Sequence, residues 1–190
     1  MKKNLELLAI LLIPVAIAVN AVGFQIAQLL RLPVYLDAIG TILIGAIAGP
    51  VAGLIAGLLT NFINGIFNPV YLPYSILSGI LGITAGVLSH YNCFKTIKGT
   101  IFAGVVLSLV STVIAAPITV IVFGGVTGST MSAATAVLLA SGQKIWGAVF
   151  STQLVSEIAD KMISVFIVHS LIKKMSSRYL SKLEYGSKYL

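Results

Sequence analysis

Charged side chains are scarce in this chain: they make up 9% of its 190 residues, whereas hydrophobic residues make up 58%. Soluble domains carry about 25% charged residues. With a mean hydropathy of +1.06, the sequence has too little charge to cover a water-facing surface. This shortage excludes a soluble enzyme and an isolated soluble binding domain, and we expect an integral membrane protein instead.

The sequence also lacks the residues that several chemistries require. Cys93 is its single cysteine, which excludes an intrachain disulfide and a multi-cysteine metal site. The two histidines, His90 and His169, share no ligand spacing, so we expect no metal. No Walker loop, HExxH or GxSxG motif occurs, so we expect neither ATP hydrolysis nor a catalytic residue in this chain. The two aspartates, Asp37 and Asp160, leave an intramembrane aspartyl protease open as an alternative class.

Apolar runs, by contrast, fill most of the sequence. They predict an all-α bundle of six transmembrane helices that forms one domain over residues 1–190. A helix needs about 20 residues to cross the hydrocarbon core, so we expect the second to fourth runs to tilt, to thin the bilayer locally or to run into one another. The first run has no convincing cleavage context and is interpreted as a retained span. The predicted spans cover residues 5–30, 36–48, 51–67, 73–89, 97–123 and 144–172.

The basic residues are distributed unevenly between these runs. The net charge is +7, and nine basic residues fall on one side of the predicted bundle against two on the other. The positive-inside rule therefore places both termini in the cytoplasm of a multi-pass bacterial plasma membrane protein, with no nucleic-acid partner. The inner set is Lys2, Lys3, Lys95, Lys98, Lys173, Lys174, Arg178, Lys182 and Lys188, and the outer set is Arg31 and Lys144.

Small residues recur at a spacing of four, which lets helix backbones approach closely in lipid. We expect this pattern to serve internal packing, with a partner-docking face as the alternative. Pro50 interrupts the pattern, so two short helices should meet there. The repeated positions are Gly45, Gly49, Gly53, Gly57, Gly82 and Gly86.

Charges inside the last span are the strongest functional signal. Glu157 and Lys161 are four residues apart, and Asp160 is three from Glu157, so all three share one helix face. Because a charge in the membrane is costly, the group indicates either a self-neutralising ion pair or the polar floor of a ligand site. Gln153 extends this face by one turn toward the outside.

Polar side chains in the predicted outer half complete the candidate binding set. Asp37 caps the second span, pairs with Lys161 or binds substrate. The uncharged stretch 124–142 is a candidate lid, or a linker that dips into the membrane. Amides and phenols suit a polar, ring-containing ligand, although the amides also suit interhelical contacts, and the tryptophan also suits an interface anchor. The outer set is Tyr35, Asp37, Asn61, Asn64, Asn68, Tyr71, Tyr74, Lys144 and Trp146.

Two segments carry a resemblance to a known family. They are LPVYLDAIGTILIGAIAGPVAGLIAGLLTNFI, residues 32–63, and EIADKMISVFIVHSLIKK, residues 157–174. Both resemble the S component of energy-coupling factor (ECF) vitamin transporters, in the riboflavin and hydroxymethylpyrimidine branch, and the layout of six spans fits over nearly the whole chain. The resemblance implies a vitamin-binding subunit that is not an enzyme and holds no cofactor of its own.

The same resemblance implies partners. An S component docks on a T-component transmembrane subunit, and two ATPase subunits use ATP and Mg to drive transport. Many members carry two alanines spaced by four in the first span for this docking, which this sequence lacks in strict form. The nearest docking candidates are Ala16, Asn20, Gly23 and Ala27.

The polar groups of the outer half suit a neutral heteroaromatic ring that forms hydrogen bonds. Hydroxymethylpyrimidine or a pyridoxine-like ring is the predicted substrate. The alternatives are pantothenate, whose carboxylate would bind Lys144 or Lys161, and riboflavin.

Overall fold

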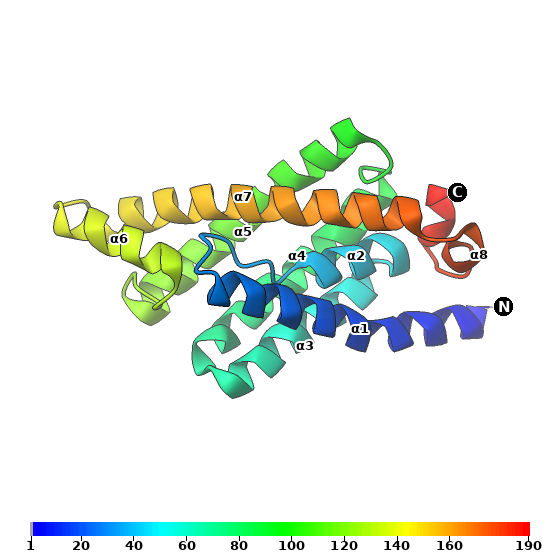
Figure 1. Ribbon diagram of the computed structural model, residues 1–190, viewed down its shortest axis with the longest axis horizontal. Coiled ribbons are helices and arrows are strands. Elements are labelled where there is room, and N and C mark those ends of the chain that lie inside the picture. The colour runs from blue at the N-terminus through cyan, green and yellow to red at the C-terminus, as the bar shows by residue number, and fades with distance from the viewer. Residues whose placement is uncertain (1) are drawn as a thin grey trace.

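Helices account for nearly all of the chain (Figure 1). The computed structural model describes the backbone of residues 2–190 and the side chains of residues 7–190. The predicted lysines at positions 2 and 3 therefore lie outside the described side chains. The elements are α1 (Lys2–Leu29), α2 (Ile39–Ala48), α3 (Pro50–Phe67), the 3-10 helix η1 (Pro69–Tyr74), α4 (Ser75–His90), α5 (Ile97–Phe123), α6 (Thr130–Ala140), α7 (Ile145–Lys174), α8 (Ser177–Leu180) and the 3-10 helix η2 (Gly186–Tyr189).

Local sequence signals fix several of these boundaries. The Thr96 side chain accepts a hydrogen bond from the N–H of Gly99 and so caps the start of α5. Gly124 ends the same helix in the left-handed conformation that glycine adopts most easily. Gly49, at φ 96°, turns α2 into α3, and Pro50 occupies the first turn of α3. The predicted meeting of two short helices at Pro50 is therefore what the structure shows.

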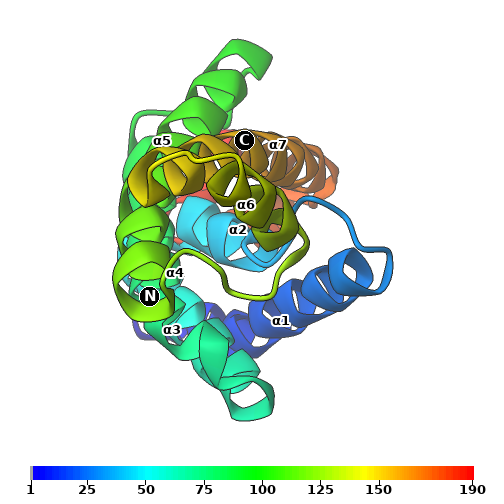
Figure 2. The ribbon, with the colours of Figure 1, turned by 90° about the vertical axis from the view of Figure 1, so that its left-hand side faces the viewer.

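The shortest apolar helix lies at the centre of the bundle. In the end-on view of Figure 2, α2 lies inside the ring formed by the longer helices. Nine of its ten residues are buried, and it contacts α1, α3, α4 and α7. A helix that is apolar on all sides has no face for water and is stable when other helices surround it. The packing of α2 is therefore provided by the surrounding helices.

Helices α3 and α4 pack against each other through glycine. A Cβ atom on Gly53 would lie 2.5 Å from the carbonyl oxygen of Gly82 and 2.9 Å from the Cα of Gly45. Glycines at this contact therefore let three backbones meet, as the spacing predicted. The repeated glycines serve internal packing here, which was the preferred interpretation of the pattern.

Four stretches are long and apolar enough to cross a membrane: Leu7–Leu29, Pro50–Phe67, Pro69–His90 and Ile97–Phe123. Helix α2 has 10 residues, and the 30-residue α7 carries three charged residues in its interior. The count of six spans remains a prediction, as does the cytoplasmic location of the termini. Both ends of the chain lie at the same end of the molecule, opposite α6 (Figure 1).

The predicted lid, residues 124–142, is not a continuous loop. Its middle forms α6, whose start is capped by the Ser129 side chain, which accepts a hydrogen bond from the N–H of Ser132. The hydroxyls of Thr135 and Thr152 are 2.8 Å apart and join α6 to α7. Alanine, leucine and methionine in this stretch favour a helix. The prediction of a loop considered only its glycine and serine content.

The four docking candidates on α1 face the interior. Ala27 and Asn20 have 0% exposure and Ala16 has 3%. Asn20 donates hydrogen bonds to Thr41 and Thr60 from its amide nitrogen, and its oxygen accepts one from the N–H of Gly40.

At Gly23, a Cβ atom would collide with the carbonyl oxygen of Leu36. The structure thus corrects the assignment of Ala16, Asn20, Gly23 and Ala27 as an exposed docking face. They were chosen because Gly23 and Ala27 are the small pair nearest to the alanine motif of the family, and the sequence does not reveal which side of a nearly uniform helix is buried. The exposed side of α1 carries larger residues, which are Leu7, Ile10, Leu11, Val15, Val22 and Ile26.

The glycine contact yields a direct test. Gly53→Ala should lower the free energy of unfolding by about 1–3 kcal/mol, because the new methyl group meets backbone that cannot move aside. Gly147→Ala, in α7, is the matched control, since nothing lies within 4 Å of the position that its Cβ would take. Thermal unfolding in detergent should show an early transition for Gly53→Ala alone. Equal transitions for the two variants would contradict the packing role of Gly53.

Candidate functional site

A cavity lies in the half of the bundle away from the chain ends. Its empty volume is about 620 Å³, a figure that includes open solvent at its mouth. Six helical elements and two connections contribute to its wall. The lining residues are Phe24, Tyr35, Asp37, Asn61, Val70, Tyr71, Tyr74, Leu77, Ser78, Leu81, Ala115, Thr127, Ser129, Gln153, Glu157 and Lys161.

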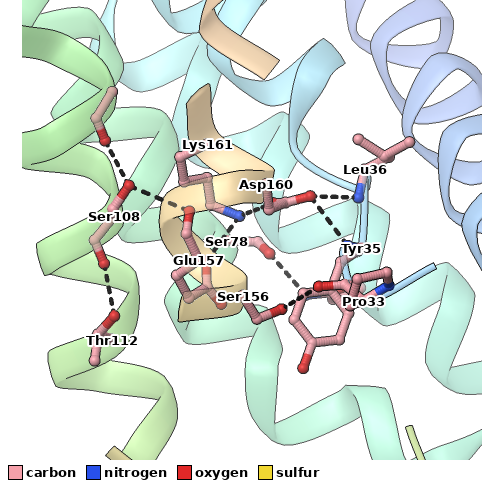
Figure 3. Close-up of polar contacts among 12 residues, drawn as sticks. Pro33, Tyr35, Leu36, Ser78, Ser108, Thr112, Ser156, Glu157, Asp160 and Lys161 are labelled. Carbon is pink, nitrogen blue, oxygen red and sulfur yellow. Dashed lines mark hydrogen bonds and ion pairs between the residues drawn. The ribbon is translucent and has the colours of Figure 1, made fainter. Parts of the chain in front are cut away.

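The connection between α1 and α2 is held against α7 by Asp160. One carboxylate oxygen, Oδ1, accepts hydrogen bonds from the backbone N–H groups of Tyr35 (3.0 Å) and Leu36 (2.6 Å) (Figure 3). Ser156 adds a hydrogen bond of 2.8 Å to the carbonyl oxygen of Pro33. Leu36 has φ 52°, a left-handed conformation that is costly for a side chain of this kind. The hydrogen bonds from α7 therefore hold a strained loop in place and aim it at the cavity.

Lys161 bridges the two acids of its own helix. Its Nζ lies 2.5 Å from Oδ2 of Asp160 and 3.1 Å from Oε2 of Glu157, and all three residues are at most 2% exposed. Figure 3 shows the ammonium between the two carboxylates. The contact with Glu157 is an ion pair without hydrogen-bond alignment, so Oε2 keeps free accepting capacity. Glu157 and Lys161 line the cavity, whereas Asp160 lies behind them.

Asp37 brings a third carboxylate to the site. It is half-buried, lines the cavity and forms no ion pair with any side chain in the described part of the chain. Burial raises the pKa of its carboxyl to about 6, although the Lys161 ammonium acts in the opposite direction. The proposed cap of α2 is absent, since the residue before α2 is Ala38 and no side chain caps it. Asp37 is therefore free to contact a ligand.

A chain of hydrogen bonds crosses the cavity on the other side. Gln153 donates from Nε2 to the Thr119 hydroxyl (3.1 Å), which is 2.7 Å from the Tyr74 hydroxyl. The Asn61 amide donates to the carbonyl oxygen of Tyr74 and to the Ser78 hydroxyl. Gln153 is 8% exposed, and its Oε1 has no partner among the described residues. That oxygen is a buried acceptor which a ligand can satisfy.

Aromatic rings form the apolar part of the wall. Phe24 and Tyr71 make an edge-to-face pair with ring centres 4.8 Å apart, and Tyr74 stacks on Phe123 at 5.9 Å. Tyr35 contributes a third phenol from the α1–α2 connection, where burial raises the pKa of its hydroxyl well above the usual range. The phenol stays protonated and can donate a hydrogen bond. Rings and acceptors together suit a flat ligand with polar substituents.

Eight of the twelve predicted binding residues meet at this cavity. They are Tyr35, Asp37, Asn61, Tyr71, Tyr74, Gln153, Glu157 and Lys161. The other four do not line it. Lys144 and Trp146 are exposed at the start of α7, Asn68 caps η1 through the N–H of Val70, and Asn64 is buried elsewhere.

Several lining residues were missed in the sequence. Phe24 lies in an apolar run that contains no other signal of function. Ser78 lies in a span in which only the glycines were considered. Thr127 and Ser129 fall at the start of the predicted lid, whose low charge was the available signal. Among the described residues, no three His, Cys, Asp or Glu side chains are placed to hold a metal ion.

The role of Asp160 can be tested by stability. Asp160→Asn should lower the free energy of unfolding by about 3–5 kcal/mol, because Lys161 and the loop N–H groups lose their buried anionic partner. Ser164→Ala is the control on the same helix, since the Ser164 hydroxyl is buried without a partner among the described residues. Thermal unfolding in detergent measures both. A wild-type transition for Asp160→Asn would show that the carboxylate does not hold the loop.

Comparison with known proteins agrees with this arrangement. A family model described as "ECF transporter, substrate-specific component" matches residues 8–172. Comparisons with curated proteins and with solved structures gave no significant match. The matched range contains every residue that lines the cavity, and it ends before α8 and η2. Proteins of this family are substrate-binding membrane subunits of transporters, and the chain belongs to the substrate-specific components of ECF transporters.

Proposed function

We propose that the cavity is the vitamin-binding site of this subunit and that its ligand is a small heteroaromatic molecule. Hydroxymethylpyrimidine and a pyridoxine-like ring are the preferred ligands, with pantothenate or riboflavin as the alternative. The observation that carries the proposal is the combination of a cavity with aromatic walls, the buried Gln153 Oε1, which has no partner among the described residues, and the Glu157 carboxylate, which shares the Lys161 ammonium with Asp160. Native proteins leave few buried acceptors unsatisfied, so the Gln153 oxygen favours a ligand that donates hydrogen bonds.

The position of the cavity supports uptake. Parts of its lining come from the connections before α2 and before α6, which lie away from the chain ends in Figure 1, and the excess of Lys and Arg near the termini favours a cytoplasmic location for those ends. With this orientation the cavity belongs to the outer half of a bacterial plasma membrane. Docking on a T component with two ATPases that use ATP and Mg then supplies the energy for transport.

An aspartyl protease, the alternative from the sequence, has no support. Both oxygens of Asp160 are occupied by the loop N–H groups and the Lys161 ammonium. A carboxylate in that position cannot activate water together with Asp37, and we do not propose protease activity.

Ligand binding by Glu157 gives the sharpest test of the proposed function. Purified wild-type protein should bind hydroxymethylpyrimidine or pyridoxine in isothermal titration calorimetry. Glu157→Gln should weaken that binding by about 1–3 kcal/mol, since an amide oxygen is a poorer acceptor than a carboxylate.

Glu184→Gln is the matched control. It neutralises a glutamate beside Gly49, in the tail after α7 and outside the cavity lining. Its affinity should equal that of the wild type. Glu157→Gln with wild-type affinity would remove Glu157 from the site, and wild-type protein that binds neither compound would contradict the proposed ligand class.

A further inference from the structure

The charges around the cavity do not balance. Asp37, Glu157 and Asp160 are three carboxylates, and they face one ammonium, that of Lys161. Lys161 is the one basic residue among the described residues that line the cavity. With all four groups ionised, the site carries two surplus negative charges.

The single ammonium is already committed. The ammonium makes its shorter contact with Oδ2 of Asp160. The other oxygen of Asp160 accepts hydrogen bonds from the N–H groups of the loop. Glu157 shares the ammonium as an ion pair without hydrogen-bond alignment, and Asp37 has no ion-pair partner in the described chain. The uncompensated charge is therefore on the two acids that line the cavity.

Hydrogen-bonding capacity shows the same bias. Gln153 and Glu157 are 8% and 2% exposed; Gln153 Oε1 has no hydrogen-bond partner among the described residues, and the partner of Glu157 Oε2 is the Lys161 ammonium at 3.1 Å. Both residues line the cavity, as does Asp37. The Gln153 amide nitrogen donates to the Thr119 hydroxyl, which leaves Oε1 as the open position of the side chain in this structure. These accepting oxygens therefore favour a ligand that donates hydrogen bonds.

We infer that the ligand is a cation: a heteroaromatic ring with a protonated, N–H-donating amine held between Asp37, Glu157 and Gln153. This inference rests on the proposed function and specifies its substrate class. A carboxylate that leaves water without a counter-ion is unfavourable, and a cationic ligand supplies a counter-ion for Asp37 and adds one for Glu157, which otherwise shares Lys161 with Asp160. The phenol and phenyl faces of Tyr71, Tyr74 and Phe24 add attraction for a cation.

The same electrostatics rank other ligands. A neutral alcohol of the same shape donates one hydrogen bond but leaves the surplus charge in place. A carboxylate adds a further negative charge next to Asp37 and Glu157, and Lys161 is not free to receive it. The cavity should therefore disfavour pantothenate, whose carboxylate would need a free ammonium such as that of Lys161.

Two series of compounds test the inference by calorimetry with the purified full-length protein. The first is pyridoxamine, pyridoxine and 4-pyridoxate, and the second is a 4-amino-2-methylpyrimidine with an aminomethyl, hydroxymethyl or carboxylate group at position 5. In each series the ring is constant and one substituent changes its charge. We expect at least about tenfold tighter binding of the amine than of the alcohol in one series, and no binding of the carboxylate.

Variants then locate the charge. Asp37→Asn should reduce the ratio of amine to alcohol affinity about tenfold, whereas Glu184→Gln should keep the wild-type ratio. The wild-type comparison decides the question even where Asp37→Asn does not fold. An alcohol or carboxylate that binds as tightly as the amine would overturn the inference and leave the proposed function intact. Failure of all six compounds to bind would overturn the proposed function, and the inference with it.

Discussion

The carboxylate of Asp160 ties together parts of the chain that are more than 120 residues apart in sequence. It accepts the N–H groups of Tyr35 and Leu36 and pairs with Lys161 of its own helix. Backbone groups outside a helix need partners when they are buried, and a loop next to lipid has no water to supply them. The carboxylate supplies them for the α1–α2 connection, and the Lys161 ammonium is its counter-ion. Tyr35 and Asp37 reach the cavity because this contact fixes the loop that carries them.

The second constraint is space at the centre of the bundle. Helix α2 is surrounded by four longer helices, and glycines bring the backbones of α3 and α4 together beside it. Close packing in this half of the molecule needs small residues, whereas the half around η1 and α6 is lined by rings, amides and acids. The division explains how a chain with so few charged residues forms a polar site: three carboxylates and one ammonium of the described chain are gathered at the cavity end of α7 and in the α1–α2 connection.

Much of the fold follows from local signals in the sequence. Five of the six predicted apolar runs match α1, α2, α3, α5 and α7 to within a few residues, because each is bounded by a cap, a proline or a charged turn. The fourth is divided into η1 and α4 at Ser75. Charged residues in an apolar helix indicated the site for a physical reason, since a membrane protein keeps such groups where they have partners or a function.

The sequence could not show which side of each helix faces the interior of the bundle. Asn20 was assigned to a docking surface, yet its amide joins α1 to Thr41 and Thr60 in the interior. Lys144 was assigned to the site, yet it is exposed at the start of α7, away from the cavity lining. Thr127 and Ser129 reach the cavity because α6 folds back on α7, and that contact depends on tertiary packing rather than on a local motif.

The central claim is that the cavity holds one small organic ligand at the Glu157–Lys161 end. Native mass spectrometry of the protein purified from cells in gentle detergent tests it most directly. The account predicts a single bound small molecule that is released on activation and is identified by fragmentation as a nitrogen heterocycle. Protein that carries no small molecule, both as purified and after incubation with an extract of its host cells, would contradict the claim.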